Sequence, residues 1–475
     1  MTPTMDTPAR RIHFIGVCGT AMATLAAMLK AKGLDVQGSD QHMYPPMSDF
    51  LVAEGIRTLD GYRADHITDD IELVVVGNAI SRGNVELEEV LDRRIRYVSM
   101  PEAIRDQFLW HARSIVVAGT HGKTTTTSMI AWVLQHAGRD PSFLVGGIVK
   151  ALGRSYQLGK GQDFVIEGDE YDSAFFDKTA KFLKYRPDIA VVGNLEYDHA
   201  DIYPDMEALR VAFRRFVNLV PRRGLLVVGA DSPEAAALVS GARSRVETVG
   251  LTDHADWRAV EIEPRSGQVA FTVVQRGLRR GQIVLAAVGE HNVRNALAVY
   301  AVAVEAGLTH AEIQAGLGTF GGVKRRLELR GEARGVKVYD DFAHHPTAIL
   351  ETIRALRASE PGRRVWAIFE PRSATSCRRV FQDDFARAFA ESGADEILIA
   401  PVFRSSLPED QRLSVAELVR DIVAAGRSAR APESVDALVA LVAADARPGD
   451  LVLAMSNGGF EGVHDKLLFA LGALG

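Results

Sequence analysis

The stretch VVAGTHGKTTTTSM, residues 116–129, decides the fold of the chain around it. Apolar, mostly β-branched residues run up to Gly119, the chain turns over three residues, and a helix-compatible sequence begins at about Lys123. A short apolar strand that leads through a glycine-rich turn into a helix is typical of parallel α/β sheets. The sequence therefore predicts a buried strand, a tight turn and a helix in this order.

The same turn has the features of a phosphate-binding loop. Backbone N–H groups at such a turn and the positive end of the helix attract phosphate, and Lys123 and Thr124 stand where P-loops bind phosphate and Mg²⁺. Gly119 lies only three positions before Gly122, which departs from GxxxxGK[ST], so a plain strand–turn–helix junction with a surface lysine is the alternative. We predict an ATP site formed by Gly119, Thr120, His121, Gly122, Lys123, Thr124 and Thr125.

Three series of alternating strands and helices follow one another along the chain. The first contains RIHFIGV, LDVQGSD and ELVVVGN, and the second contains SIVVAGT, DFVIEGDE, DIAVVGNLE and GLLVVGAD. Between about Trp257 and Ala287, the stretches QVAFTVVQR and QIVLAAV alternate in polarity and predict antiparallel strands. The third series contains VKVYDDFAHHP, RVWAIFEP, DEILIAP and DLVLAMSNGG.

We predict an α/β fold of three domains from these series. A Rossmann-like domain is expected at 1–110, and a second Rossmann-like domain at 325–475. Between them, 111–324 should form a P-loop ATPase-like parallel sheet with an added antiparallel portion. A length of 475 residues is ample for several domains of ordinary size.

Composition excludes several classes of protein. The chain is 47% hydrophobic and 24% charged with a net charge of −6, so we expect no nucleic-acid partner, which usually requires a basic face. Two cysteines are too few for a disulfide framework and fit a reducing compartment. MTPTMDTPARR at the start has no apolar core of a signal peptide, and no apolar run of about 18 residues occurs. We expect a cytoplasmic protein without a membrane partner.

Acidic residues follow two of the expected central strands. Glu167, Asp169, Glu170 and Asp172 follow one strand, and Glu196, Asp198, His199 and Asp201 follow another. Oxygen-rich ligands suit Mg²⁺, and a histidine can join a second, less purely oxygen-ligated metal site. Any one of these carboxylates alone is as well explained by a solvated loop charge. Two clusters downstream of a phosphate loop favour a metal-dependent nucleotide site.

Four motifs together resemble the Mur ligase family in order and spacing: GTHGKTTT (119–126), EGDEYD (167–172), NLEYDHAD (194–201) and GEHNVRNALA (289–298). The resemblance implies ATP and Mg²⁺ as cofactors. It assigns Lys123 to the γ-phosphate, Thr124 and Glu167 to a first Mg²⁺, and His199 to a second. It also places Asn292 and Asn295 near the adenine, with His291 beside them, although Asn292 could simply cap a helix.

The resemblance also bears on a modified lysine. Several members of the family carry a carbamylated lysine that helps to hold the second metal. Our alignment puts Phe213, within MEALRVAFRRF, at that place. We therefore predict no carbamylated lysine, which fits the branch that acts directly on the muramyl carboxylate.

The N-terminal segment HFIGVCGTAMATLA (13–26) places glycines between a strand and a helix. A dinucleotide site would require GxGxxG, and this pattern is incomplete, although an acidic residue, Asp40, follows at the expected distance. An NAD-binding protein is the alternative, but a second nucleotide domain beside an ATP site fits UDP better. Cys18 is expected to be a packing residue and not a nucleophile. The predicted UDP-sugar ligands are Gly16, Cys18, Gly19, Thr20, Ser39, Asp40 and Asn78.

The third series begins with VKRRLELRG (323–331) and YDDFAHHPTAI (339–349). In the family this domain closes over ATP, which implies that Arg326 and Asp341 contact the nucleotide and that Lys123, His199, Arg326 and His344 are catalytic. A solvated linker is the alternative for the arginines, and a surface helix entry is the alternative for the histidines, most of all for His345.

The resemblance implies UDP-N-acetylmuramate as the acid substrate and leaves two amine acceptors. One branch attaches L-alanine, and another attaches a recycled tripeptide, L-Ala-γ-D-Glu-meso-diaminopimelate. YPPMS (44–48), EPRSATS (370–376) and MSNGGFEGVH (455–464) resemble the peptide branch, which we favour. The extra peptide carboxylates are assigned to Arg372, Ser373 and Asn457.

Overall fold

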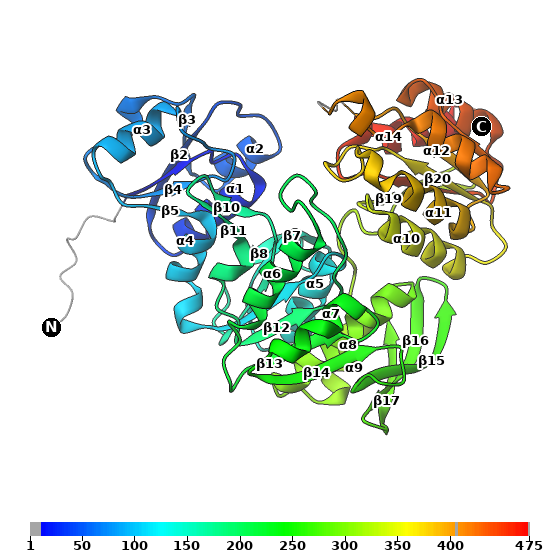
Figure 1. The fold of residues 1–475 in the computed structure, drawn as a ribbon, viewed down its shortest axis with the longest axis horizontal. Coiled ribbons are helices and arrows are strands. Elements are labelled where there is room, and N and C mark those ends of the chain that lie inside the picture. The colour runs from blue at the N-terminus through cyan, green and yellow to red at the C-terminus, as the bar shows by residue number, and fades with distance from the viewer. Residues whose placement is uncertain (1–10, 404–406, 474–475) are drawn as a thin grey trace.

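Three α/β units follow one another in the structure, each built around its own sheet (Figure 1). The computed structural model describes residues 11–403 and 407–473, so the expectation about a signal peptide at 1–10 lies outside the described residues. The predicted α/β class is confirmed. The boundaries predicted near 110 and 324 stay predictions.

The first sheet is parallel throughout the described part, in the order β3-β2-β1-β4-β5. Its strands are β1 (Arg11–Ile15), β2 (Asp35–Asp40), β3 (Arg57–Asp60), β4 (Ile71–Val76) and β5 (Tyr97–Ser99). Its helices are α1 (Thr20–Ala31), α2 (Met47–Ala53), α3 (Val85–Asp92) and α4 (Met100–Gln107). Strands β1, β2 and β4 were predicted, whereas β3 and β5 lack a continuous apolar run and were missed.

The central sheet has the order β17-β16-β15-β14-β13-β12-β6-β9-β7-β8. Its parallel strands are β6 (Arg113–Ala118), β7 (Ser142–Val149), β9 (Asp163–Glu167), β12 (Ile189–Val192), β13 (Leu225–Gly229), β14 (Arg245–Gly250) and β15 (Trp257–Arg265). The antiparallel strands are β8 (Arg154–Gln157), β16 (Gln268–Gln275) and β17 (Leu278–Leu285). The predicted antiparallel addition is confirmed. A separate antiparallel pair contains β10 (Asp172–Ala174) and β11 (Asp177–Ala180).

Helices cover the central sheet: α5 (Lys123–His136), α6 (Met206–Val217), α7 (Pro233–Ala237), α8 (Glu290–Glu305) and α9 (His310–Gly318). Strand β6 is almost completely buried, as expected for a parallel strand with helices over both faces. Two buried clusters result, one of which packs α5 and α8 against the sheet. Within the described residues, no helix is both long and apolar enough to cross a bilayer.

The third sheet has the order β18-β19-β23-β20-β21-β22 and is parallel except for its edge strand β18. Its strands are β18 (Glu328–Ala333), β19 (Val336–Asp341), β20 (Val365–Phe369), β21 (Glu396–Ile399), β22 (Ala429–Arg430) and β23 (Leu451–Met455). Its helices are α10 (Pro346–Ser359), α11 (Gln382–Ser392), α12 (Val415–Ala424), α13 (Val435–Asp445) and α14 (Val463–Gly472). The four apolar runs predicted for this unit are β19, β20, β21 and β23.

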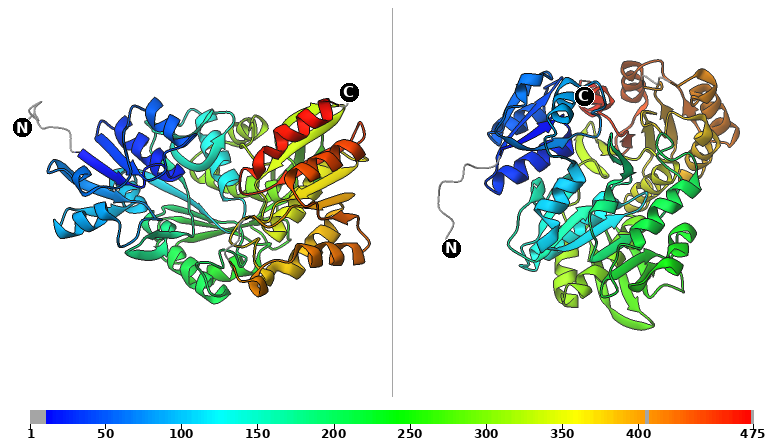
Figure 2. Two further views of the ribbon diagram at one scale, coloured as in Figure 1. Left: turned by 90° about the horizontal axis from the view of Figure 1, so that it is seen from above. Right: turned by 60° about the vertical axis from the view of Figure 1, so that its left-hand side comes forward.

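The first and third units lie on either side of the central unit, and the views of Figures 1 and 2 agree on this arrangement. Helix α10 of the third unit contacts α8 of the central unit. A side chain at Gly289 would meet the Ala355 Cβ at 2.6 Å, so glycine lets the two helices approach closely. A cavity of about 1670 Å³ is lined by residues of all three units.

Phe213, which the sequence analysis aligned with the modified lysine of other family members, provides a test of the packing under α6. Its side chain is 1% exposed on α6, and its ring lies 5.1 Å from the ring of Phe182. Replacing Phe213 by Ala should lower the free energy of unfolding by about 3–5 kcal/mol, because it removes a buried ring and leaves a cavity. Urea denaturation followed by circular dichroism measures this change.

Phe469 on α14 is 79% exposed and provides the matched control. Phe469→Ala should change the free energy of unfolding by less than about 0.5 kcal/mol. Equal effects of the two substitutions would contradict the packing described for Phe213.

Candidate functional site

The loop between β6 and α5 has the geometry predicted for it. Helix α5 begins at Lys123, as expected, and Gly119 and Gly122 both have positive φ, of 129° and 80°. A Cβ at Gly119 would lie 2.9 Å from the Asn194 carbonyl oxygen, and one at Gly122 would lie 2.7 Å from the Asn295 Oδ1. Glycine is therefore favoured at both positions by the positive φ, and at Gly119 also by the close approach of the Asn194 backbone.

Lys123 lies inside this loop and not on the surface. Its Nζ donates hydrogen bonds to the Gly119 carbonyl at 2.7 Å and to Glu170 Oε1 at 2.8 Å. Burial alone would lower the pKa of Lys123, but the carboxylates of Glu170 and Asp169 outweigh it and raise the pKa. The ammonium is therefore charged at neutral pH and available to phosphate oxygens.

Thr124 and Glu167 come together as predicted. The Thr124 hydroxyl donates to Glu167 Oε1 at 2.9 Å, and the Gly146 N–H donates to Glu167 Oε2 at 2.8 Å. Arg326, which follows the central unit, brings its guanidinium to 3.4 Å from the Thr124 hydroxyl. Two oxygen ligands and a cationic group therefore meet at the beginning of α5.

His199 lies beside Glu170 on the same side of the sheet. His199 Nε2 is 2.9 Å from Glu170 Oε1, and the ring packs against Tyr171 at 4.4 Å between centroids. Glu170 Oε2 is buried, and no other described residue gives it a hydrogen bond. A buried carboxylate oxygen without a donor beside an imidazole nitrogen fits a cation, so these donors agree with the predicted second metal ligand. The sequence analysis placed Glu170 in a cluster of carboxylates but did not predict it as a metal ligand.

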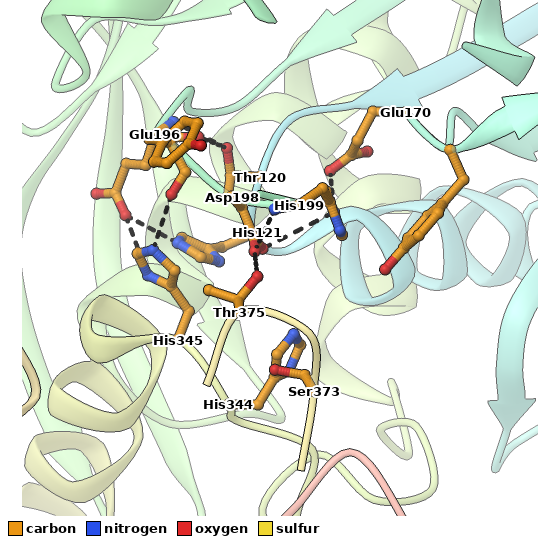
Figure 3. A network of polar contacts seen from close by, with 12 residues as sticks. Thr120, His121, Glu170, Glu196, Asp198, His199, His344, His345, Ser373 and Thr375 are labelled. Atoms are coloured by element: carbon orange, nitrogen blue, oxygen red, sulfur yellow. Dashed lines mark hydrogen bonds and ion pairs between the residues drawn. The ribbon is translucent and has the colours of Figure 1, made fainter. Parts of the chain in front are cut away.

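The turn after β12 connects the loop to the third unit (Figure 3). His121 Nε2 lies 2.9 Å from Glu196 Oε2, which also accepts a hydrogen bond from the Thr347 hydroxyl at 2.7 Å. Burial favours the neutral carboxyl, but the hydrogen bond and charge of His121 outweigh it and lower the pKa of Glu196. His345 packs its ring 4.6 Å from the ring of His121. The alternative of a surface position for His345 is wrong, because its side chain is buried.

The segment expected near adenine lies at the beginning of α8. This helix begins at Glu290 after Gly289, so the alternative that Asn292 caps it is wrong. The Asn292 Nδ2 instead donates to the Val288 carbonyl at 2.8 Å, and the Asn295 Nδ2 donates to Asn292 Oδ1 at 3.2 Å. The segment faces the cavity, and burial lowers the pKa of His291.

Asp341 and His344 lie where β19 leads into α10. Asp341 accepts hydrogen bonds from the backbone N–H groups of Leu327 at 2.6 Å and Ala343 at 2.7 Å. Burial raises the pKa of Asp341 and lowers that of His344. The Arg325 guanidinium donates to the carbonyls of Ser456 and Gly458 at 2.6 Å, so the solvated-linker alternative is wrong for it. These contacts fix the beginning of the third unit.

The loop between β1 and α1, predicted to bind UDP, is held by hydrogen bonds from its backbone N–H groups to the end of β2. The backbone N–H of Gly16 donates to the Ser39 carbonyl at 2.9 Å, and the N–H of Cys18 donates to Asp40 Oδ2 at 2.9 Å. Helix α1 begins at Thr20 after Gly19. Asp40 therefore holds the loop in shape, which is a contact that the motif alone did not reveal.

A buried polar network beneath this loop was missed by the sequence analysis. Glu86 is completely buried on α3, and His13 and His66 approach its carboxylate at 3.2 and 2.7 Å. The hydroxyl of Ser39 donates to the same carboxylate, so it is the backbone carbonyl of Ser39 that contacts the loop between β1 and α1, where it accepts a hydrogen bond from the Gly16 N–H. A histidine in the middle of an apolar strand, His13, was the available signal.

The residues predicted for the peptide lie around the end of β23. The Arg372 guanidinium stacks on Phe403 at 3.8 Å, and the Ser373 hydroxyl donates to Ser376 Oγ at 2.9 Å. Asn457 Oδ1 is buried, and no described residue gives it a hydrogen bond. An acceptor of this kind requires a donor from a ligand or solvent.

The cavity brings together most of the predicted site residues. Those along its wall are Thr20, Thr120, His121, Gly122, Lys123, Thr124, Thr125, Glu167, His199, Asn292, Asn295, Arg326, Asp341, His344, Ser373 and Asn457. Those outside its lining are Gly16, Cys18, Gly19, Ser39, Asp40, Asn78, Gly119 and Arg372. The parts predicted for ATP and metal are therefore contiguous, and Thr20 connects them to the first unit.

Comparison with protein families matches three consecutive segments of the chain. Residues 11–108 match "Mur ligase family, catalytic domain", and residues 117–303 match "Mur ligase middle domain". Residues 325–458 match "Mur ligase, glutamate ligase domain". The chain belongs to the Mur ligase family. The resemblance inferred from the four sequence motifs is therefore confirmed.

Individual Mur ligases are similar over nearly the whole chain. UDP-N-acetylmuramate–L-alanyl-γ-D-glutamyl-meso-2,6-diaminoheptandioate ligase of Escherichia coli K12 is 41% identical, with 97% of this chain and 98% of the relative covered. UDP-N-acetylmuramate–L-alanine ligase of Agrobacterium fabrum is 39% identical, with 94% of each covered. The crystal structure of a murein peptide ligase from Psychrobacter arcticus 273-4 superposes with a TM-score of 0.70 at 37% identity, over 98% of this chain and 99% of the other.

Cys18 provides a test of the loop in the first unit. Burial, together with the negative charge of Asp40, raises the pKa of the Cys18 thiol to about 11. Because the thiolate is the reactive form, alkylation by iodoacetamide at pH 8 should be roughly 100-fold slower than that of a free cysteine. Its rate should increase with pH up to about 11, as measured by mass spectrometry of the Cys18 peptide.

Asp40→Asn removes the charge that contributes to this shift and should move the inflection of the alkylation rate to lower pH. An inflection below about pH 9 in the unsubstituted chain would contradict the described surroundings of Cys18 and the expectation that it is not a nucleophile.

Proposed function

We propose that this Mur ligase joins the tripeptide L-Ala-γ-D-Glu-meso-diaminopimelate to the carboxylate of UDP-N-acetylmuramate at the expense of ATP, in the cytoplasmic recycling of peptidoglycan. The observation that carries the proposal is the meeting of Lys123, the Thr124–Glu167 pair and Arg326 at one wall of a cavity between three units. The names of the relatives from E. coli and P. arcticus support the peptide as acceptor.

ATP would bind with its phosphates on the loop before α5 and its adenine near Asn292 and Asn295. Mg²⁺ fits the paired oxygens of Thr124 and Glu167, and a second ion fits His199 beside the undersatisfied Glu170 carboxylate. When bound, such ions neutralise phosphate charge. In the first unit, the N-terminal end of α1 would hold the UDP pyrophosphate.

The reaction would proceed in two substitutions. A carboxylate oxygen of the muramyl group attacks the γ-phosphorus of ATP, and the bond to the β-phosphate oxygen breaks, giving an acyl phosphate and ADP. The free amine of the tripeptide then attacks the acyl carbon, loses a proton and expels inorganic phosphate. Lys123 and Arg326 supply positive charge beside the phosphoryl group, and closure of the units excludes water from the acyl phosphate.

Two features favour a peptide over free alanine as the acceptor. The cavity extends past the loop before α5 to Ser373, which follows β20, and to Asn457, which follows β23. The unpartnered Asn457 Oδ1 can accept a peptide N–H. Ligation of L-alanine is the second candidate function, and the similarity to the Agrobacterium fabrum ligase supports it.

Offering both acceptors in parallel tests the proposed function. Phosphate release from ATP should require UDP-N-acetylmuramate and should be fast with the tripeptide and slow with L-alanine. The coupled product is measured by mass spectrometry. A preference for L-alanine would contradict the peptide assignment, and phosphate release that ignores both substrates would contradict the ligase assignment.

Lys123→Met tests the role of the loop lysine, because it keeps the length of the side chain and removes the charge. Turnover should fall by at least about 100-fold, since a preorganised cation at the transferred phosphate is lost. Lys160→Ala, at an exposed position, is the matched control and should leave turnover unchanged. Near-normal turnover of Lys123→Met would contradict the role assigned to Lys123, and thermal unfolding verifies that the variant is folded.

A further inference from the structure

Three side chains from separate segments converge at the nucleotide loop, the loop of residues 119–122 between β6 and α5. His121 belongs to that loop, Glu196 follows β12, and His345 immediately precedes α10 of the third unit. One ligand atom of each lies within 4.8 Å of those of the other two. His121 Nε2 is 2.9 Å and His345 Nδ1 is 3.5 Å from Glu196 Oε2. Figure 3 shows the three side chains pointing toward one another.

The protonation of His345 leaves one nitrogen in this cluster unused. Its Nε2 lies 3.3 Å from the Tyr197 carbonyl oxygen, which can only accept a hydrogen bond, so Nε2 carries the proton. Nδ1 then presents a lone pair toward the Glu196 carboxylate. This nitrogen is buried, and within the described ranges it has no hydrogen-bond partner, while the residue is only 6% exposed. The unpartnered His345 Nδ1 and the partly exposed Glu196 carboxylate therefore face each other as two electron-pair donors 3.5 Å apart, an arrangement that a metal cation between them would stabilise.

The surrounding contacts resemble the outer shell of a metal site. A ligating histidine usually donates its other ring N–H to a carbonyl or carboxylate, as the Nε2 of His345 does with Tyr197. The Thr347 hydroxyl donates to Glu196 Oε2 at 2.7 Å and orients that carboxylate. These two contacts hold the imidazole and the carboxylate in position before any ion enters.

The chemistry of the donors selects the ion. Two imidazoles and one carboxylate favour Zn²⁺ and neighbouring transition metals, whereas Mg²⁺ prefers oxygen ligands. Tetrahedral Zn²⁺ with bonds near 2.0–2.1 Å requires ligand atoms about 3.3 Å apart, which lies between the two distances measured to Glu196 Oε2. Three protein ligands would leave a fourth position for water.

We propose that His121, Glu196 and His345 form a binding site for Zn²⁺ or a related transition-metal ion, separate from the Mg²⁺ ligands proposed at Thr124, Glu167 and His199. The ion would connect the nucleotide loop of the central unit to the beginning of α10 in the third unit. It would therefore stabilise the arrangement of these two units that the structure describes.

Two of the three proposed ligands line two cavities. A second cavity of about 380 Å³ includes Glu196, His345 and Phe381 in its wall, and Glu196 and His345 also line the large cavity. The cluster therefore lies between two cavities, and Glu196 and His345 line both of them.

Zn²⁺ binding to the full-length protein in excess Mg²⁺ tests the site, because Mg²⁺ then occupies the oxygen-ligated positions. A chromophoric chelator in competition gives affinity and stoichiometry, and Co²⁺ as a probe gives a visible spectrum that reports coordination. We expect one Zn²⁺ per chain, an intense tetrahedral Co²⁺ band and a higher Tm with Zn²⁺.

Variants identify the ligands. His345→Asn keeps a residue suited to the helix N-cap position, and Glu196→Gln keeps a side chain of the same shape; each should weaken Zn²⁺ binding by at least about 100-fold and abolish the Co²⁺ band. His254→Ala, at an exposed histidine, and His199→Asn, in the proposed Mg²⁺ site, should keep both. Circular dichroism verifies folding, and the two ligand variants provide independent tests.

Three results would overturn the proposal. One is the absence of stoichiometric Zn²⁺ binding by the unsubstituted protein. Another is unchanged binding in folded His345→Asn and Glu196→Gln. The third is loss of the Zn²⁺ site in His199→Asn, which would assign the ion to the nucleotide metal site.

Discussion

Strands β9, β6 and β12 are hydrogen-bonded neighbours and run parallel, so their carboxyl ends lie at one edge of the central sheet. This constraint determines where the chemistry can occur. The loop with Lys123 leaves β6, Glu167 ends β9, and the turn with Glu196 and His199 follows β12. Residues separated by up to 76 positions in sequence therefore come within hydrogen-bonding distance. Ligands of open α/β sheets bind at this edge for the same reason.

The edge of the central sheet provides only part of the candidate site, and residues of the third unit provide the rest. Arg326 reaches the Thr124 hydroxyl, and Thr347 donates to Glu196, so the second and third units share polar contacts across the cavity. Thr375 also donates to Asp198, so several polar contacts hold the two units together at this site.

Much of this could be predicted from sequence because the signals were local. A β-branched run that ends in GTHGKT specifies a strand, a turn and a helix, and the turn favours glycine at Gly119 and Gly122. The pairing of Thr124 with Glu167 followed from two strands that end at one edge and from the resemblance to a family. The alternation of apolar residues likewise predicted the antiparallel strands β16 and β17.

What sequence could not provide were contacts that depend on packing between distant segments. Glu86 looks like an exposed helix residue, and its burial follows from His13 in the adjacent strand. His345 was assigned a surface alternative, but the docking of α10 against the central unit buries it. Asn292 was a plausible helix cap until the position of Gly289 moved the beginning of α8 by one turn. In the first two cases, the residue that explains the burial lies on another element. In the third case, the backbone conformation at Gly289 sets where the helix begins.

The central claim is that the cavity activates a carboxylate as an acyl phosphate before the amine attacks. UDP-N-acetylmuramate labelled with ¹⁸O in its lactyl carboxylate tests it most directly. Each turnover with ATP and the tripeptide should transfer one ¹⁸O atom to the released inorganic phosphate, as measured by mass spectrometry. Phosphate that contains no ¹⁸O while the peptide product accumulates would contradict the account.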